Sequence, residues 1–465
     1  MKLKRDLSFF DLTNIIIGSI VGSDIYIASA LTAGLIGPFS IFVWLVAGFF
    51  AILLALIFAY SSYYVPKVGG SFAFVSAAFD DFYGFLAGWS MWIAELAALP
   101  VFAITFVFYL QYFFPNLEPL QQILIKGLFL FSLTFVNILG VKTAGRLNDI
   151  LTIVKLLPLV LIVLAGGLFL FFNGKILTAN YFPLAPLGFE NFGTALVLIF
   201  WAYVGFELGT LPASEVKNPK KTIPKAIISG MIIVILFYIS TNFVVYGMIN
   251  WKDLTKTSLP LVLAGSVLFG AIGAAIMTIG ALVSVSGSDE SGVLGTARLS
   301  FAMSVDGLFP KIFSRIHPKY KTPYIALIIQ GIIAFILSIF SQVKDLISFS
   351  VFNLAFTFLL TSLALLILEK RKNELHGQNI LPWIGIAICL YLLYSTSLFD
   401  KMTGTILILI GIPIYVFFSP KADIMHMKKL LVSEENLMAS RLERKEKFLA
   451  HFILLLHRLY KKIAG

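Results

Sequence analysis

The sequence contains a single cysteine, Cys389, and only five histidines among its 465 residues. One cysteine excludes an intrachain disulfide and gives no indication of a metal or redox site. The sequence also lacks an H-E-x-x-H cluster, a nucleophile elbow and a phosphate-binding loop, and its histidines lie outside the centres of the long apolar runs. We therefore expect neither an enzyme nor a bound cofactor, and we do not expect ATP to be used.

Charge is scarce as well. Only 13% of the residues are charged and 59% are hydrophobic, with 45 Phe, whereas a soluble chain has about a quarter charged residues. Residues 37–65, 226–251 and 322–343 contain no charge at all, and about 20 apolar residues suffice to cross the hydrocarbon of a bilayer. The basic start runs directly into such a stretch, so we expect no cleavable signal peptide. These features predict an all-α, multi-pass membrane protein.

Apolar runs of this length predict twelve transmembrane spans. They lie near residues 9–33, 38–64, 83–112, 121–140, 149–172, 191–212, 225–249, 261–301, 323–341, 345–368, 379–398 and 402–419. With both termini cytoplasmic, the inner loops hold most of the Lys and Arg residues between spans, as the positive-inside rule requires. The net charge of +11 is thus an orientation signal, and we expect a cell-membrane protein that contacts the lipid bilayer and no nucleic acid.

Two of these runs are interrupted by small residues and an acid. The segment 18–24 (GSIVGSD) interrupts the first span, and 203–209 (YVGFELG) interrupts the sixth. An unwound segment survives at membrane depth only where it lines a cavity enclosed by protein or filled with water. Two such breaks at equivalent places in two halves of a chain are typical of a transporter's substrate site.

The two halves also agree in plan. Spans 1–5 and 6–10 each open with a broken helix, and each third member carries acids, Glu95 in span 3 and Asp289 with Glu290 in span 8. This arrangement resembles the LeuT-type 5+5 inverted repeat, in which helices 1 and 6 are broken. Spans 11 and 12 lie outside the repeat and would be accessory.

Several motifs, in a shared order and spacing, resemble those of the amino acid–polyamine–organocation superfamily. They are the first-span segment, 66–74 (PKVGGSFAF), Gly88-Trp89 with Trp92, 137–142 (NILGVK), 202–207 (AYVGFE), 215–219 (EVKNP) and 306–310 (DGLFP). The resemblance covers the chain to about residue 420, which predicts a transporter domain over 1–420. It implies an amino acid permease, a secondary active transporter that works by alternating access. We expect proton-coupled uptake of an amino acid.

Breaking a helix frees peptide groups that can hold a zwitterion. Freed amides at the start of a half-helix bind carboxylates, and freed carbonyls at the end of the preceding half-helix suit an ammonium group. The resemblance implies that the amides around Gly22 and Ser23 hold the substrate carboxylate. It implies that carbonyls near Ile20, Phe200 and Tyr203 hold the amine. Gly205 belongs to the same second break. The alternative is that these glycines only permit close helix packing.

Asp24 departs from the superfamily pattern, which usually has a glycine there. An acid in the membrane interior suggests a function, and its charge would oppose a substrate carboxylate but favour an amine, a proton or a basic partner. A polyamine or amine carrier, or an amino acid exchanger of the same fold, is therefore the alternative function. The structural alternative is that Asp24 caps the broken helix by accepting bonds from the freed amides.

Two residues are candidates for proton coupling. Lys155 lies within the fifth span, and burial disfavours the charged form of a lysine, so it can gain and lose a proton during a transport cycle. The resemblance places it where sodium binds in sodium-coupled relatives, surrounded by the carbonyls of Gly18 and Val21 and the hydroxyls of Ser284 and Ser286. The alternative is a lysine that snorkels to the inner surface. Glu207 closes the second break and is expected either to carry a proton or to accept bonds from freed amides.

Residues 421–465 differ from the rest of the chain, because Lys and Arg outnumber Asp and Glu there and apolar residues recur at helical spacing. This pattern predicts a cytoplasmic, basic amphipathic tail that rests on the anionic inner leaflet. A regulatory or partner-binding helix is the alternative.

Overall fold

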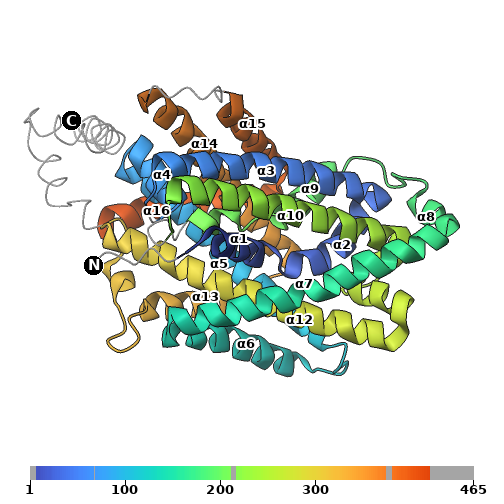
Figure 1. Cartoon of the computed structure of the whole chain (residues 1–465). Helices are drawn as coiled ribbons and strands as arrows, with labels where there is room; N and C mark the ends of the chain where they lie inside the picture. Colours follow the sequence, from blue (N-terminus) through green and yellow to red (C-terminus); the bar gives the residue numbers. More distant parts are fainter. Residues whose placement is uncertain (1–6, 68, 211–215, 373–379, 419–465) are drawn as a thin grey trace, which may run out of the picture.

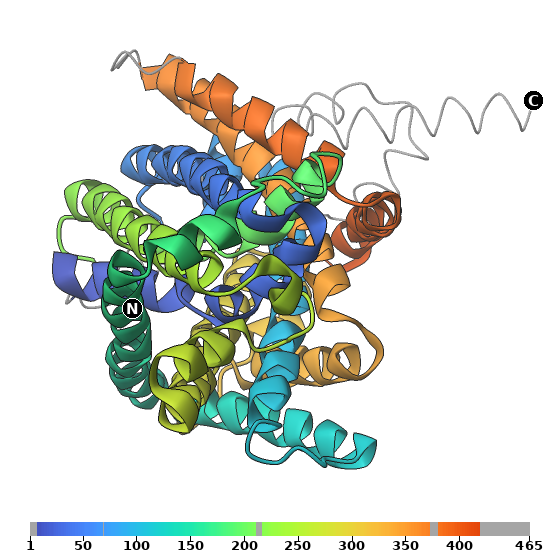
Figure 2. The same cartoon turned by 90° about the vertical axis from the view of Figure 1, so that its right-hand side faces the viewer.

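The computed structural model describes residues 7–67, 69–210, 216–372 and 380–418, and within these ranges it is a helical bundle without a β-strand. Figures 1 and 2 show most helices running side by side along one direction. The helices are α1 (Phe9–Ile20), α2 (Ser23–Ile36), η1 (Gly37–Phe39), α3 (Ser40–Tyr64), α4 (Ser71–Ala78), α5 (Asp81–Leu110), α6 (Pro119–Leu139), α7 (Val141–Phe172), α8 (Gly174–Tyr181), α9 (Phe192–Trp201), η2 (Phe206–Thr210), α10 (Pro219–Met248), α11 (Trp251–Leu254), α12 (Pro260–Val305), η3 (Lys311–Ser314), α13 (Tyr324–Phe340), α14 (Val343–Lys372), α15 (Ile380–Ser395) and α16 (Leu398–Phe418).

These helices agree with the predicted membrane class. Among the described residues, nine helical stretches are long and apolar enough to span a bilayer, and the first of them, Phe9–Tyr64, contains α1, α2 and α3. Two predicted spans, 323–341 and 379–398, correspond to the shorter apolar helices α13 and α15. The chain is therefore a multi-pass membrane protein. The predicted tail, 421–465, lies outside the described residues.

Burial places α5 inside the bundle. In its most apolar window 83% of the residues are buried, against 22% for α16, and α5 packs against α12, α13 and α14. Its start is fixed by Asp80, whose side chain accepts a hydrogen bond from the Tyr83 amide, because a cap of this kind satisfies one of the free amides at a helix start. The acid carried by this central helix, Glu95, is consequently held inside the protein.

The first predicted interruption is present in the structure. Helix α1 ends at Ile20 and α2 begins at Ser23, so the chain leaves helical geometry at Val21 and Gly22. The backbone of Val21 is extended, with φ −72° and ψ 99°. Gly22 is buried and packs against Ser288 and Phe102. A glycine here lets the broken backbone lie directly against α12 and α5.

The second interruption is present as well. Helix α9 ends at Trp201, a turn follows over residues 202–205, and η2 starts at Phe206. Gly205 has φ +120°, a conformation that side-chain-bearing residues rarely adopt. Residues 211–215, which include the Glu215 of one predicted motif, lie outside the described residues.

The predicted eighth span, 261–301, is wrong in one respect. Within α12 the backbone is non-helical at Phe269 and Gly270, and Gly265 lies against the backbone of Gly273. The first turns of α12 therefore fold back on the rest of the helix. The positive φ of Gly270, 62°, permits this reversal, and the uninterrupted apolar sequence gave no other sign of it.

Candidate functional site

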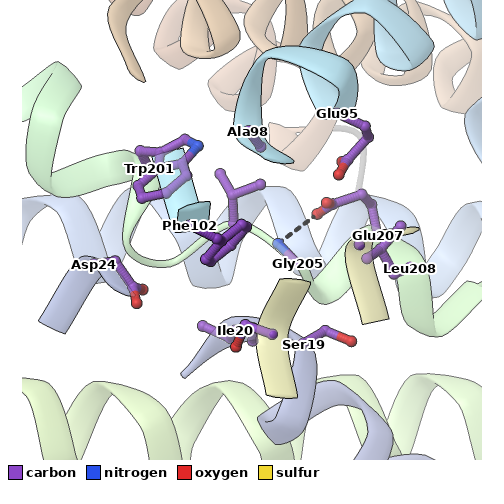
Figure 3. Close-up of a pocket in the computed structure, with 13 residues that line it drawn as sticks. Ser19, Ile20, Asp24, Glu95, Ala98, Phe102, Trp201, Gly205, Glu207 and Leu208 are labelled. Carbon is purple, nitrogen blue, oxygen red and sulfur yellow. Dashed lines mark hydrogen bonds between the residues drawn. The ribbon is translucent and has the colours of Figure 1, made fainter. Parts of the chain in front are cut away.

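A small buried cavity lies where the two breaks meet. Figure 3 shows it between the end of α1, the start of α2, α5 and the turn before η2. Its volume is about 40 Å³, which holds a few water molecules at most. The lining residues are Ser19, Ile20, Asp24, Glu95, Ala98, Phe102, Trp201, Val204, Gly205, Glu207, Leu208, Ser288 and Gly292. A ligand of amino acid size therefore requires the walls to separate.

The two breaks touch through their backbones. A Cβ atom on Gly205 would lie 3.0 Å from the carbonyl carbon of Ser19 and 3.1 Å from the amide nitrogen of Ile20. Because the obstacle is backbone, a neighbouring rotamer change cannot relieve it. Glycine is thus required at this position both for its φ and for the close approach of the two segments.

Each break carries a carboxylate on its own glycine amide. The Gly22 amide donates to Asp24 Oδ1 at 2.7 Å, and the Gly205 amide donates to Glu207 Oε2 at 3.0 Å (the latter drawn in Figure 3). In both cases the acid stands two residues after the glycine. The bond at Gly22 is the contact that the capping interpretation of Asp24 predicts, and Asp24 also lines the cavity.

Tyr238 of α10 holds the first break from the side. Its hydroxyl lies 2.8 Å from Asp24 Oδ2 and 3.1 Å from the Ile20 carbonyl oxygen. It therefore contacts both ends of the break, on either side of Val21 and Gly22. Nothing in the sequence signals this role, because Tyr238 is one of 17 tyrosines and its position depends on how α10 is rotated.

Two carboxyl groups face each other on the opposite side of the cavity. Figure 3 shows the Glu95 side chain of α5 directed toward Glu207, and the two groups interact. Glu95 is 7% exposed and Glu207 is fully buried. Like charges at such a place repel strongly in a low-dielectric interior, so the pair is suited to share a proton or to hold a cation.

Lys155 of α7 contacts the end of α1 and the facing side of α12, beside the first break. It is fully buried, and its ammonium donates to the Gly18 carbonyl oxygen and, at 3.2 Å, to Ser288 Oγ. Ser288 Oγ also lies 2.7 Å from the Val21 carbonyl oxygen. The lysine is directed at the break, which does not fit the snorkelling alternative.

The predicted surroundings of Lys155 need one correction. Ser284 Oγ lies 3.4 Å from the Val21 carbonyl oxygen, which is a long distance for a hydrogen bond. Ser286 Oγ instead donates to Leu282 O of its own helix. Side chains four residues apart share a helix face and those two apart do not, so Ser288 takes the place predicted for Ser286.

The structure divides the predicted substrate-binding residues into two groups. Ile20, Asp24, Gly205 and Glu207 line the cavity, whereas the remaining four lie outside its lining: Gly22, Ser23, Phe200 and Tyr203. The Tyr203 hydroxyl donates to the Trp44 carbonyl oxygen at 3.1 Å. The Phe200 carbonyl accepts a bond from the Tyr203 amide, so in this conformation it is already engaged.

Aromatic side chains close one side of the cavity. Trp201 and Phe102 both line it, with ring centroids 5.9 Å apart. Nothing in the sequence distinguishes Phe102 from the other 44 of the 45 Phe.

Comparison with known proteins also indicates a transporter. The family model for amino acid permeases matches residues 7–421. The branched-chain amino acid permease BcaP of Bacillus subtilis is 28% identical over 446 residues, which cover 90% of this chain and 94% of the relative. The serine/threonine exchanger SteT of the same organism is 28% identical over 432 residues, covering 89% and 96%.

A third relative, the methylthioribose transporter of Bacillus subtilis, is 26% identical over 446 residues, covering 91% of this chain and 95% of the relative. These relatives are transporters by name, and they align along nearly their whole length. With a family match that spans both breaks, the chain belongs to the amino acid permease family of the amino acid–polyamine–organocation superfamily.

Proposed function

We propose that this protein is a secondary active transporter that imports amino acids by alternating access with proton symport. The observation that carries the proposal is the contact between the two breaks, where Gly205 lies against Ser19 and Ile20 beside a buried cavity. Broken backbone at membrane depth is stable only around such a cavity. The names of the relatives support an amino acid as cargo.

The proposal includes the finer architecture. Twelve spans, arranged as a LeuT-type 5+5 inverted repeat with two accessory spans, would form a transporter domain over residues 1–420 in the cell membrane. Both termini, with the tail 421–465, would be cytoplasmic. The paired breaks, each with an acid two residues after a glycine, support the repeat.

In the transport site, the amides of Gly22 and Ser23 would receive the substrate carboxylate, and the carbonyls near Ile20, Phe200 and Tyr203 would receive its amine. Asp24, Gly205 and Glu207 complete the site. Since the cavity holds only a few waters, substrate binding would separate the aromatic wall formed by Trp201 and Phe102 from the breaks.

Proton coupling would involve Lys155 and Glu207. Lys155 bridges Gly18 and Ser288, so loss of its proton would weaken a contact between α1 and α12, because the neutral amine keeps N–H donors but loses its charge. Glu207 interacts with Glu95 across the cavity, and a proton on either acid would relieve their repulsion. Each proton change would thus alter a contact beside the breaks.

The alternative is a polyamine or amine carrier, or an amino acid exchanger, with the same fold. Three carboxyl groups, those of Asp24, Glu95 and Glu207, line the cavity, which favours a cationic ligand. One relative is named for methylthioribose rather than for an amino acid, so family membership alone does not fix the cargo.

Thermal melting of the purified protein with single amino acids and polyamines, at two pH values, tests the proposal. A ligand that binds the folded state raises the melting temperature by mass action. Proteoliposome uptake of each hit, with and without an imposed proton gradient, then tests transport and coupling. We expect saturable uptake that an inward proton gradient accelerates. Single-channel currents in place of saturable uptake would contradict a transporter.

A further inference from the structure

We propose that Asp24 determines substrate specificity by acting as an internal occupant of the carboxylate position at the first break. In the empty protein its carboxylate holds the Gly22 amide, and a substrate carboxylate must displace it. This inference rests on the proposed function, since it concerns the same transport site.

The geometry shows a carboxylate that is held from two sides. Oδ1 accepts from the Gly22 amide at 2.7 Å and Oδ2 lies 2.8 Å from the Tyr238 hydroxyl. The side chain is 4% exposed and lines the cavity. Both oxygens of the side chain are thus taken, and the Gly22 amide is engaged at a short distance.

The bond to the Gly22 amide is the one that capping predicts, but its geometry is not that of an ordinary N-cap. An N-cap side chain accepts from an amide two or three residues further along the helix, whereas Asp24 lies inside α2 and reaches back to Gly22 before it. Its second partner, Tyr238, comes from another helix. The neighbouring hydroxyl of Ser23 is fully buried and has no hydrogen-bond partner within the described part of the chain. A donor is thus left beside the occupied amide.

The surrounding acidic residues also favour a substrate amine over a substrate carboxylate. Glu95 and Glu207 line the same cavity, and the described lining residues include no lysine, arginine or histidine. A substrate amine therefore meets three carboxyl groups, while a substrate carboxylate meets repulsion and an amide that is already taken. Consequently the carboxylate of the substrate should contribute little to the binding free energy.

Matched ligand pairs test this inference. Each pair joins an amino acid to the amine that remains when its carboxylate is removed: leucine with 3-methylbutylamine, ornithine with putrescine, and arginine with agmatine. Dissociation constants are measured by titration of the purified full-length protein and of four variants. For the wild type we expect the two members of each pair to bind within about threefold of each other.

The Asp24→Gly variant frees the Gly22 amide and removes a negative charge. We expect it to favour the amino acid over its amine by about tenfold or more. Asp24→Asn keeps an acceptor for the amide but loses the charge, and should shift the ratio in the same direction by less. Tyr238→Phe releases Oδ2 and the Ile20 carbonyl oxygen but leaves the Gly22 amide on Oδ1, and should also give a partial shift.

Glu95→Gln is the matched control, because it removes a charge from the same cavity without touching the Gly22 amide. Both members of a pair carry the amine, so both affinities should fall. Because Glu95 also repels the substrate carboxylate but holds no amide of the break, the ratio should shift by less than it does in Asp24→Gly. If Asp24→Gly and Asp24→Asn leave the ratio unchanged while the ligands still bind, the inference is wrong. If no amino acid or amine binds the wild type, the proposed function itself fails.

Discussion

Gly205 is a residue at which the structure leaves no room for a side chain. Its φ of +120° and the 3.0 Å that would separate an added Cβ from the Ser19 carbonyl carbon are independent reasons for a missing side chain. Holding a residue that has a side chain at this φ lowers stability by about 1–3 kcal/mol. The close contact with the Ser19 backbone adds to that loss. Both effects act at the point where the two breaks meet.

We therefore expect Gly205→Ala to lower the free energy of unfolding by at least about 1–3 kcal/mol and to abolish uptake. Thermal melting and proteoliposome uptake measure the two effects. Gly167→Ala is the control, because Gly167 lies in α7 with nothing within 4 Å of an added Cβ, and alanine is the better helix former. Equal behaviour of the two variants would contradict the close contact.

Lys155 is the residue for which we predict an effect on proton coupling. Replacing it by methionine keeps much of the side-chain length and removes the ammonium that contacts Gly18 and Ser288. We expect Lys155→Met to give uptake that no longer responds to an imposed proton gradient. The measurement is the ratio of initial uptake rates with and without the gradient.

Lys126→Met provides the comparison for Lys155→Met. Lys126 of α6 also donates to a backbone carbonyl, that of Ser338 at 2.8 Å, but it does not line the cavity. Its replacement should leave the gradient response intact. A response that survives in Lys155→Met would remove Lys155 from the coupling mechanism.

At the scale of elements, α12 presents one face to the first break. Ser284 and Ser288 lie on that face, four residues apart, while Ser286 bonds to its own helix. The face is decisive because Ser288 contacts Lys155 and the Val21 carbonyl together. We therefore expect a change on this face to alter the break more than a change two residues away.

Ser288→Ala should therefore reduce the melting temperature and the uptake rate, with a loss of about 1–3 kcal/mol for buried polar groups left without a partner. Ser286→Ala, which removes a hydroxyl of the same size from the same helix, should stay within about 0.5 kcal/mol of the wild type. The comparison uses thermal melting and uptake of both variants. A larger effect at Ser286 would show that the helix is rotated differently.

The sequence predicted most elements but not their rotations. Small residues and an acid inside an apolar run predicted the break around Gly22, because such residues are out of place in lipid-facing helix. The choice of Ser288 over Ser286 required the orientation of α12 toward Lys155. Tyr238 and Phe102 reach the site through packing, and the reversal at Gly270 lies in an uninterrupted apolar stretch. None of these can be read from composition or spacing alone.

At the scale of the whole molecule, the family match ends where the predicted tail begins, at residue 421. The residues of the proposed transport site lie entirely within the matched region. We therefore expect a protein truncated after residue 421 to keep the uptake rate and ligand affinity of the full chain, as proteoliposome assays would measure. Loss of uptake in a truncated protein that still melts cooperatively would favour the regulatory interpretation of the tail.

The backbone also ties the two broken segments at a second place. Leu7, just before α1, forms a bridge with Val216, and the Lys217 amide donates to the Leu7 carbonyl oxygen at 2.9 Å. With Gly205 against Ser19, the segments are fastened both at one end and at mid-length. We therefore expect the two segments to move together as one rigid unit, so that a displacement of either broken segment also displaces the other.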